Sequence, residues 1–212
     1  MKFKIGPYDM ELIHHDPKVY TVNGVISEEE CEHFKKITFS HMQRSTVSSI
    51  GKSKVKGLLD NRRTSSNCWV KHKYDKITLD VASRIAELIQ IPLDNAEDYQ
   101  VLHYESAQEY QPHLDTFDPK LDKKGKYLSN GGQRIITVLG YLNTVEEGGE
   151  TSFPNIDKAI FPETGKIVVF HNCIDGTNRP HPDSLHGACP VIQGEKWAFN
   201  LWFREKARSR NL

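Results

Sequence analysis

The run Lys196-Trp-Ala-Phe-Asn-Leu-Trp-Phe203 is the last of four short segments with strand-like composition. The other three are Tyr99–Tyr104, Arg134–Leu142 and Lys166–Phe170, and clusters of glycine and proline separate them. Many short strands without long helices between them favour an antiparallel sandwich or a jelly roll. We therefore expect these segments to build a double-stranded β-helix, with alternate residues of 196–203 facing a core and a pocket.

Two helices are expected before this series of strands. Ser27-Glu-Glu-Glu30 matches a capping box, so a helix should begin there and continue to about Ile37. A second helix should run from about Asp75 to Ile89, because apolar residues recur at helical spacing until Pro92 ends the pattern. Both helices should pack outside the β-rich part of the chain.

The length of 212 residues fits one domain of ordinary size. We expect an α+β, mainly β fold over residues 1–212, with a helical N-terminal support region at 1–95 and a jelly-roll core at 96–206.

Basic and acidic residues are equal in number, 28 each, so the formal charge is zero. No overall basic field is present to hold phosphates, and nucleic-acid binding is disfavoured.

The sequence also bears on location. It contains no run of 18 apolar residues, and its first residues lack the apolar core of a signal peptide. The four cysteines are widely separated without a Cys-x-x-Cys pair, which indicates free structural thiols in a reducing compartment. We expect a cytoplasmic protein with no membrane partner.

The most informative chemical pattern is His113-Leu-Asp115 together with His186. Other His-x-Asp pairs occur at 14–16 and 181–183, but only this one follows a strand-like run. In extended chain, residues i and i+2 point to the same face, so one short segment could supply two ligands. Two imidazoles and one carboxylate suit Fe(II) and leave positions open for small ligands, and zinc is the competing metal.

Several spaced motifs carry a family resemblance over nearly the whole chain. They are Gln100-Val-Leu-His-Tyr104, Tyr110-Gln-Pro-His-Leu-Asp115, Gly132-Gln-Arg134, Tyr141-Leu-Asn-Thr-Val-Glu-Glu-Gly-Gly-Glu-Thr151, and Ser184-Leu-His-Gly-Ala-Cys-Pro190 leading to Gly194-Glu-Lys-Trp197. In these motifs the chain resembles the catalytic domain of the collagen-type prolyl 4-hydroxylases. Members of that family are dioxygenases that depend on Fe(II) and 2-oxoglutarate. It looks most like the short single-domain forms of algae, viruses or bacteria.

The resemblance implies a reaction and its cofactors. The enzyme would hydroxylate C4 of a peptidyl proline in proline-rich or collagen-like sequence and release succinate and CO2. It would need Fe(II), the cosubstrates 2-oxoglutarate and O2, and ascorbate as reductant. The partner would be a proline-rich peptide or protein, and the resemblance leaves open whether the chain is a monomer or a homodimer.

The resemblance also assigns roles to particular residues. His113, Asp115 and His186 would bind iron, and Lys196 would anchor the distal carboxylate of 2-oxoglutarate through its compact ammonium group. Hydroxyl groups for the same cosubstrate would come from Tyr104 and Thr151. The substrate side would be formed by Tyr110, Arg134 and Trp202, although all three could equally be core or rim residues. Glu97 is a weaker candidate, and His103, His171 and His181 are expected to be structural.

Two long polar segments, 43–62 and 116–132, interrupt the strand pattern and could close over a bound peptide.

Two other functions remain open on sequence alone. One is an oxygenase of the same fold that acts on another protein side chain or a free amino acid. The other is a non-catalytic jelly-roll binding module, against which the intact triad and Lys196 argue. Lys196 also argues against the oxygen-sensing prolyl hydroxylases, where an arginine would occupy this position.

Overall fold

The computed structural model describes residues 1–46, 61–120, 122, 125 and 127–209. Most of the segment 43–62, one of the two expected lids, lies outside the described residues, as do four positions of the segment 116–132.

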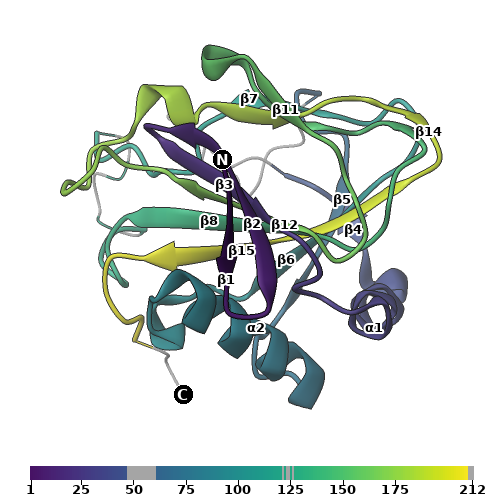
Figure 1. Cartoon of the computed structure of the whole chain (residues 1–212), viewed down its shortest axis with the longest axis horizontal. Coiled ribbons are helices and arrows are strands. Elements are labelled where there is room, and N and C mark those ends of the chain that lie inside the picture. The colour runs from purple at the N-terminus through teal and green to yellow at the C-terminus, as the bar shows by residue number, and fades with distance from the viewer. Residues whose placement is uncertain (47–60, 121, 123–124, 126, 210–212) are drawn as a thin grey trace.

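One large antiparallel sheet dominates the structure (Figure 1). Its strand order is β1-β2-β3-β12-β8-β15-β6-β5-β4. The strands are β1 (Lys2–Ile5), β2 (Tyr8–His15), β3 (Lys18–Val22), β12 (Ile167–His171), β8 (Arg134–Tyr141), β15 (Lys196–Arg204), β6 (Tyr99–Tyr104), β5 (Ser66–Val70) and β4 (Gln43–Arg44). The four segments expected to be strands are β6, β8, β12 and β15, and they lie at the centre of this sheet.

A smaller sheet of four strands has the order β11-β10-β13-β7. Its strands are β11 (Lys158–Ile160), β10 (Thr151–Phe153), β13 (His186–Ala188) and β7 (Tyr110–His113), and a separate ladder joins β14 (Val191–Gln193) to β9 (Glu147–Gly148). Buried residues from both sheets form one hydrophobic cluster, in which Phe153 of the small sheet meets Phe170 of the large one with ring centroids 5.2 Å apart. The predicted jelly roll is confirmed.

The two expected helices are α1 (Glu28–Thr38) and α2 (Lys76–Ile89), and they cover the other face of the large sheet. The capping box at the start of α1 is present, because the Ser27 side chain accepts from the Glu30 N–H and the Glu30 side chain accepts from the Ser27 N–H. Phe34 of α1 packs edge-on against Tyr99, which belongs to β6. Short 3-10 helices occur at Phe39–His41, Leu93–Asn95, Pro154–Ile156 and Pro182–Ser184.

The N-terminal region differs from the expectation of a helical support. Strands β1 to β5 all come from residues 1–95, and β3 pairs with β12 near the other end of the sequence. The segment at 8–22 was not predicted because its alternation of apolar and polar residues covers only Tyr8 to Leu12, and a turn at Asp16-Pro17 divides it into two strands. The region is therefore part of the main sheet as well as a helical cover.

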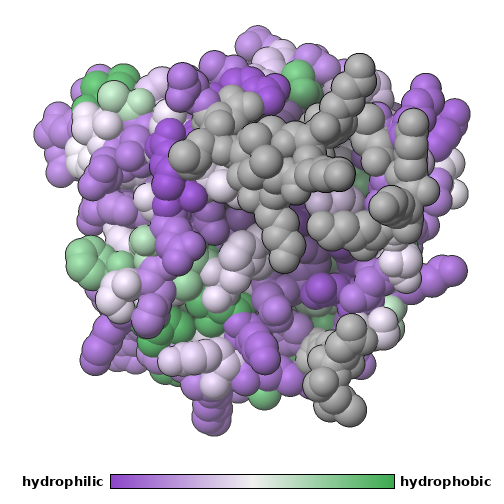
Figure 2. Space-filling model, turned by 180° about the vertical axis from the view of Figure 1, so that it is seen from behind, coloured by the Kyte–Doolittle hydropathy of each residue, from purple (hydrophilic) through white to green (hydrophobic). Residues whose placement is uncertain are grey.

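On the face shown in Figure 2, hydrophilic residues predominate and hydrophobic ones form small separate areas. No helix in the described part of the chain is long and apolar enough to cross a membrane.

Candidate active site

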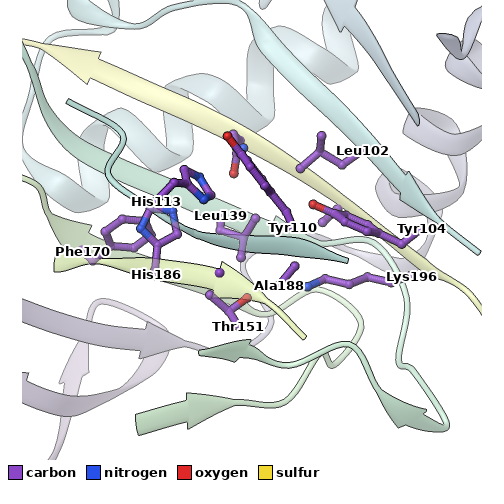
Figure 3. Close-up of a pocket in the computed structure, with 13 residues that line it drawn as sticks. Leu102, Tyr104, Tyr110, His113, Leu139, Thr151, Phe170, His186, Ala188 and Lys196 are labelled. Atoms are coloured by element: carbon purple, nitrogen blue, oxygen red, sulfur yellow. The ribbon is translucent and has the colours of Figure 1, made fainter. Parts of the chain in front are cut away.

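The pairing of β7 with β13 brings two of the three predicted metal ligands together. His113 and His186 are direct partners in the register of these strands, and Asp115 follows two residues after His113. One ligand atom from each residue lies within 4.8 Å of the others. Figure 3 shows the two imidazole rings side by side at one end of the pocket between the sheets.

Backbone carbonyl groups orient both imidazoles. Nδ1 of His113 lies 3.0 Å from the carbonyl oxygen of Gln111, and Nδ1 of His186 lies 2.9 Å from that of Ser184. A carbonyl can only accept, so Nδ1 carries the proton and the lone pair of Nε2 faces the centre of the triad. Burial lowers the pKa of His186 to about 4, so this imidazole is neutral at physiological pH, as a metal ligand must be.

The Asp115 carboxylate is held by two donors from the large sheet. Thr137 Oγ1 donates to Asp115 Oδ2 over 2.7 Å, and Trp202 Nε1 donates to the same oxygen over 2.8 Å. Burial opposes ionisation of this carboxyl, but its charged and polar surroundings, which include the Arg134 guanidinium, outweigh burial, and its pKa lies well below the ordinary value. A neutral imidazole and an ionised carboxylate pointing at one centre form a donor set that fits a divalent cation.

Lys196 occupies the other end of the same pocket. It begins β15 opposite Tyr104 of β6, and its side chain is only 1% exposed. Nζ donates to the carbonyl oxygen of Gly149 over 2.6 Å, and no carboxylate pairs with it in the part of the chain that the structure describes. Burial lowers the pKa of Lys196 to about 8. This ammonium group has hydrogen-bonding capacity left for an anion.

Two hydroxyl-bearing residues border the position of Lys196. Thr151 of β10 lines the pocket, and its Oγ1 lies 2.7 Å from the hydroxyl of Tyr141. Tyr104 also lines the pocket, with its ring centroid 5.4 Å from Lys196 Nζ. In Figure 3 the lysine side chain extends toward Thr151, so the predicted cosubstrate residues lie together.

The three predicted substrate residues separate into two groups. Tyr110 lines the pocket and stacks on His113, with ring centroids 3.7 Å apart. Arg134 and Trp202 lie behind Asp115, where the guanidinium carbon is 3.7 Å from the Trp202 ring centroid. Trp202 thus hydrogen-bonds the ligand carboxylate and also carries an arginine on its face.

Glu97 is more important in the structure than sequence analysis indicated. Its carboxylate accepts from Arg134 Nε over 2.7 Å and from Arg204 Nε over 2.6 Å. Burial raises the pKa of Glu97, but the two arginines outweigh this and the net shift is downward. The group is buried and holds Arg134 against Trp202.

Sequence analysis missed the residues that support the ligands. Thr137 stands alone as a polar residue in the apolar run of β8, and Asn172 directly follows β12. A single hydroxyl inside a buried strand needs a partner, which is the signal that could have singled out Thr137. Nothing in the sequence singled out Asn172.

The three histidines expected to be structural lie outside the triad, and His103 and His181 face carboxylates of Glu195 and Asp16.

Comparison of this chain with known proteins agrees with the geometry of the site. Residues 99–204 match the model of the 2OG-Fe(II) oxygenase superfamily. A probable prolyl 4-hydroxylase 3 of Arabidopsis thaliana is 37% identical over 94% of this chain and 73% of its own length. A putative prolyl 4-hydroxylase of Acanthamoeba polyphaga mimivirus is 35% identical over 89% of this chain and 75% of its own length.

A solved structure shares the fold. The viral collagen prolyl hydroxylase of Paramecium Bursaria Chlorella virus-1, in its 2OG complex, aligns with a TM-score of 0.68 and 24% identity, covering 88% of this chain and 95% of that one. The fold and the triad thus define a 2OG-Fe(II) oxygenase, which uses iron and 2-oxoglutarate. Within that superfamily, the chain belongs to the prolyl 4-hydroxylases. Neither of the other functions considered on sequence is favoured.

Proposed function

We propose that this enzyme hydroxylates C4 of prolyl residues in proline-rich or collagen-like peptides, with His113, Asp115 and His186 as its iron ligands. The observation that carries the proposal is one pocket with the His-Asp-His triad at one end and, at the other, a buried lysine that pairs with no carboxylate in the described residues. A 2-oxo dicarboxylic acid has two matching ends, a chelating 2-oxo acid group and a distal carboxylate. Iron with 2-oxoglutarate and O2 supplies the oxidising chemistry when bound, with ascorbate as reductant.

The residues of the chain bind and orient in this scheme. Lys196 neutralises the distal carboxylate, and the hydroxyls of Thr151 and Tyr104 donate hydrogen bonds to it. The neutral imidazole of His186 and the ionised carboxylate of Asp115 can bind a metal without loss of a proton at physiological pH. The apolar side chains that line the pocket, including Leu139 and Phe170, exclude water from it.

The substrate proline is proposed to bind on the side of the triad formed by Tyr110 and Trp202. An exposed indole extends this side, because Trp69 of β5 is 52% exposed and its ring centroid lies 5.9 Å from that of Trp202. Aromatic faces suit proline rings and extended peptides. Arg134 is already paired with Glu97, so we assign it the role of fixing the Trp202 ring beneath the peptide.

We further propose that residues 1–212 act as one catalytic domain. Strand β3 pairs with β12, and α1 shares a hydrophobic cluster with β6 and β15, which supports a single folding unit. Whether the enzyme acts as a monomer or a homodimer stays open, and the cytoplasmic location stays a prediction.

Mass spectrometry tests the reaction. The protein is incubated with Fe(II), 2-oxoglutarate, ascorbate and either poly-proline or Pro-Pro-Gly repeat peptides, and succinate is followed in parallel. We expect a gain of one oxygen on proline that depends on 2-oxoglutarate and is lost in His113→Ala. Succinate without a modified peptide would refute the proposed substrate, and normal turnover in His113→Ala would refute the metal assignment.

A further inference from the structure

A chain of hydrogen bonds continues behind the Asp115 carboxylate. Asn172 Nδ2 donates to Thr137 Oγ1 over 2.8 Å, and Thr137 Oγ1 donates to Asp115 Oδ2 over 2.7 Å. Asn172 and Thr137 are both fully buried, with exposed fractions of 0%. The chain therefore lies inside the protein, away from solvent competition.

The chemistry of the three groups fixes the direction of this chain. The Asn172 amide nitrogen can only donate, so Thr137 Oγ1 must be the acceptor in that bond. The hydroxyl has one proton, and the ionised carboxylate can only accept it. Asn172 thereby forces the proton of Thr137 toward Asp115.

The two oxygens of Asp115 become unequal as a result. Oδ2 receives both Thr137 and Trp202, and these two donors occupy its two lone pairs. Both oxygens face the triad, since Oδ1 lies 3.5 Å from His113 Nε2 and Oδ2 lies 3.6 Å from His186 Nε2, but no hydrogen bond to Oδ1 occurs in the described residues. Only Oδ1 retains free lone pairs on the side of the triad.

We propose that Thr137 and Asn172 are positioning residues that fix Asp115 so that Oδ1 alone binds the metal. They act through the carboxylate and touch neither the metal nor the substrate. This inference rests on the proposed metal site and adds two residues that determine its affinity.

The orientation of the Asn172 amide supports a positioning role over simple packing. Its Oδ1 is buried and lacks a hydrogen-bond partner within the described parts of the chain. Buried polar atoms are nearly always paired, and a residue that only filled space would not require this arrangement. With the amide reversed, its oxygen would face Thr137 and compete with Asp115 for the single proton.

Cobalt binding to the full-length protein tests the proposal without relying on turnover. Co(II) is titrated against a competing chelator, and its visible absorption reports the ligand set. We expect Thr137→Val to weaken Co(II) binding by about 30-fold, in the range of lost outer hydrogen bonds. Thr137→Ser keeps the hydroxyl and should stay within about threefold of the unmodified protein. Asn172→Leu should weaken binding by about fivefold, because Thr137 can then turn its proton away.

Non-additivity separates a chain from two independent effects. The double variant Thr137→Val/Asn172→Leu should bind Co(II) as weakly as Thr137→Val alone, since Asn172 acts through the Thr137 hydroxyl. A matched control is Thr21→Val, which removes a buried hydroxyl from β3 of the same sheet and should leave Co(II) affinity unchanged. If Thr137→Val does not fold, Thr137→Ala removes the same donor.

The outcomes distinguish this inference from the proposed function. Unchanged Co(II) affinity in Thr137→Val or Thr137→Ala, or full additivity in the double variant, would overturn the positioning role while hydroxylation by the unmodified protein stands. If the unmodified protein binds Co(II) tightly and the variants weaken this binding as expected, the positioning role is upheld. If the same unmodified protein hydroxylates no proline, the proposed function is refuted. An unmodified protein that binds no Co(II) would overturn both.

Discussion

Two regions of this enzyme bury positive charge in opposite ways. Behind the metal triad, Arg134 and Arg204 share the carboxylate of Glu97 through hydrogen bonds of 2.7 and 2.6 Å between Nε and Oε1. At the other end of the pocket, Lys196 is equally inaccessible, yet its hydrogen-bond partner is the carbonyl oxygen of Gly149. The first region carries its counter-charge within the protein, and the second does not.

The partner of a buried charge thus separates charges that stabilise the fold from charges that bind a ligand. A buried cation with a bidentate carboxylate partner is compensated, and removing the partner would leave an uncompensated charge. A buried ammonium group without an anion is costly in the empty protein and becomes favourable only when an anion arrives. On this basis the proposed role of Lys196 is to bind an anion, whereas Glu97 neutralises charge within the protein.

The largest effect is expected from breaking the compensated region. Glu97→Gln keeps the side-chain volume but leaves two buried guanidinium groups without their anion. We expect a loss of about 3–5 kcal/mol in the free energy of unfolding, measured by urea denaturation. Glu195→Gln, which removes an exposed carboxylate paired with His103, is the control and should change stability by less than about 1 kcal/mol. Equal stability of the two variants would contradict the distinction.

Removing the uncompensated charge should have the opposite sign. In Lys196→Met, the ligand-free protein should gain roughly 2 kcal/mol of stability at pH 7, because a desolvated charge is replaced by an apolar chain. Affinity for 2-oxoglutarate should fall by about 100-fold, since the distal carboxylate loses its partner. Thermal unfolding and calorimetric titration measure the two effects. A less stable ligand-free variant would show that the lysine already has its partner.

The pH dependence of the two regions should also differ. The pKa of Lys196 is lowered from 10.5 to about 8 in the folded protein. Between these values the unfolded chain binds more protons than the folded protein, so this lysine makes the ligand-free protein more stable as the pH rises. Binding of 2-oxoglutarate requires the charged form and should weaken by about tenfold per pH unit above 8. Calorimetry from pH 7 to 9.5 checks this, and a flat profile would disprove it.

The smallest effect concerns the peptide side, next to the Arg134 and Trp202 stack. Trp69→Ala should raise the KM for long proline-rich peptides by about fivefold, which corresponds to one lost aromatic contact. The kcat and the affinity for 2-oxoglutarate should remain as they are, because Trp69 touches neither end of the pocket. Kinetics with peptides of three and ten residues measure this. An equal effect on both lengths would argue against an extended contact.

Sequence alone gave a sound account of the regular elements. The four predicted strands and both helices are confirmed. The short apolar run of β15 is buried on both faces of the sheet, and the helical spacing in 75–89 reflects burial of one face of α2. The N-terminal strands were missed because the alternation in β2 ends at Leu12, where its register with β3 shifts, and five residues are a weak strand signal.

The candidate metal ligands could be predicted from the sequence, but the residues that hold them in place could not. The spacing of His113 and Asp115 indicated the ligands, and the structure brings them together with His186. The supports, Thr137, Asn172 and Glu97, act through contacts made between strands distant in sequence. No local pattern encodes such contacts, so only the folded chain reveals them.

The position of β15 has a consequence for how the enzyme is made. This strand lies between β8 and β6 in the middle of the large sheet, although its residues, 196–204, come last among the strands. The centre of the sheet therefore cannot close until residues 196–204 have been synthesised, because β8 and β6 each pair with β15. Because β15 also carries Lys196, the pocket lacks this residue until the last strand of the sheet has been made.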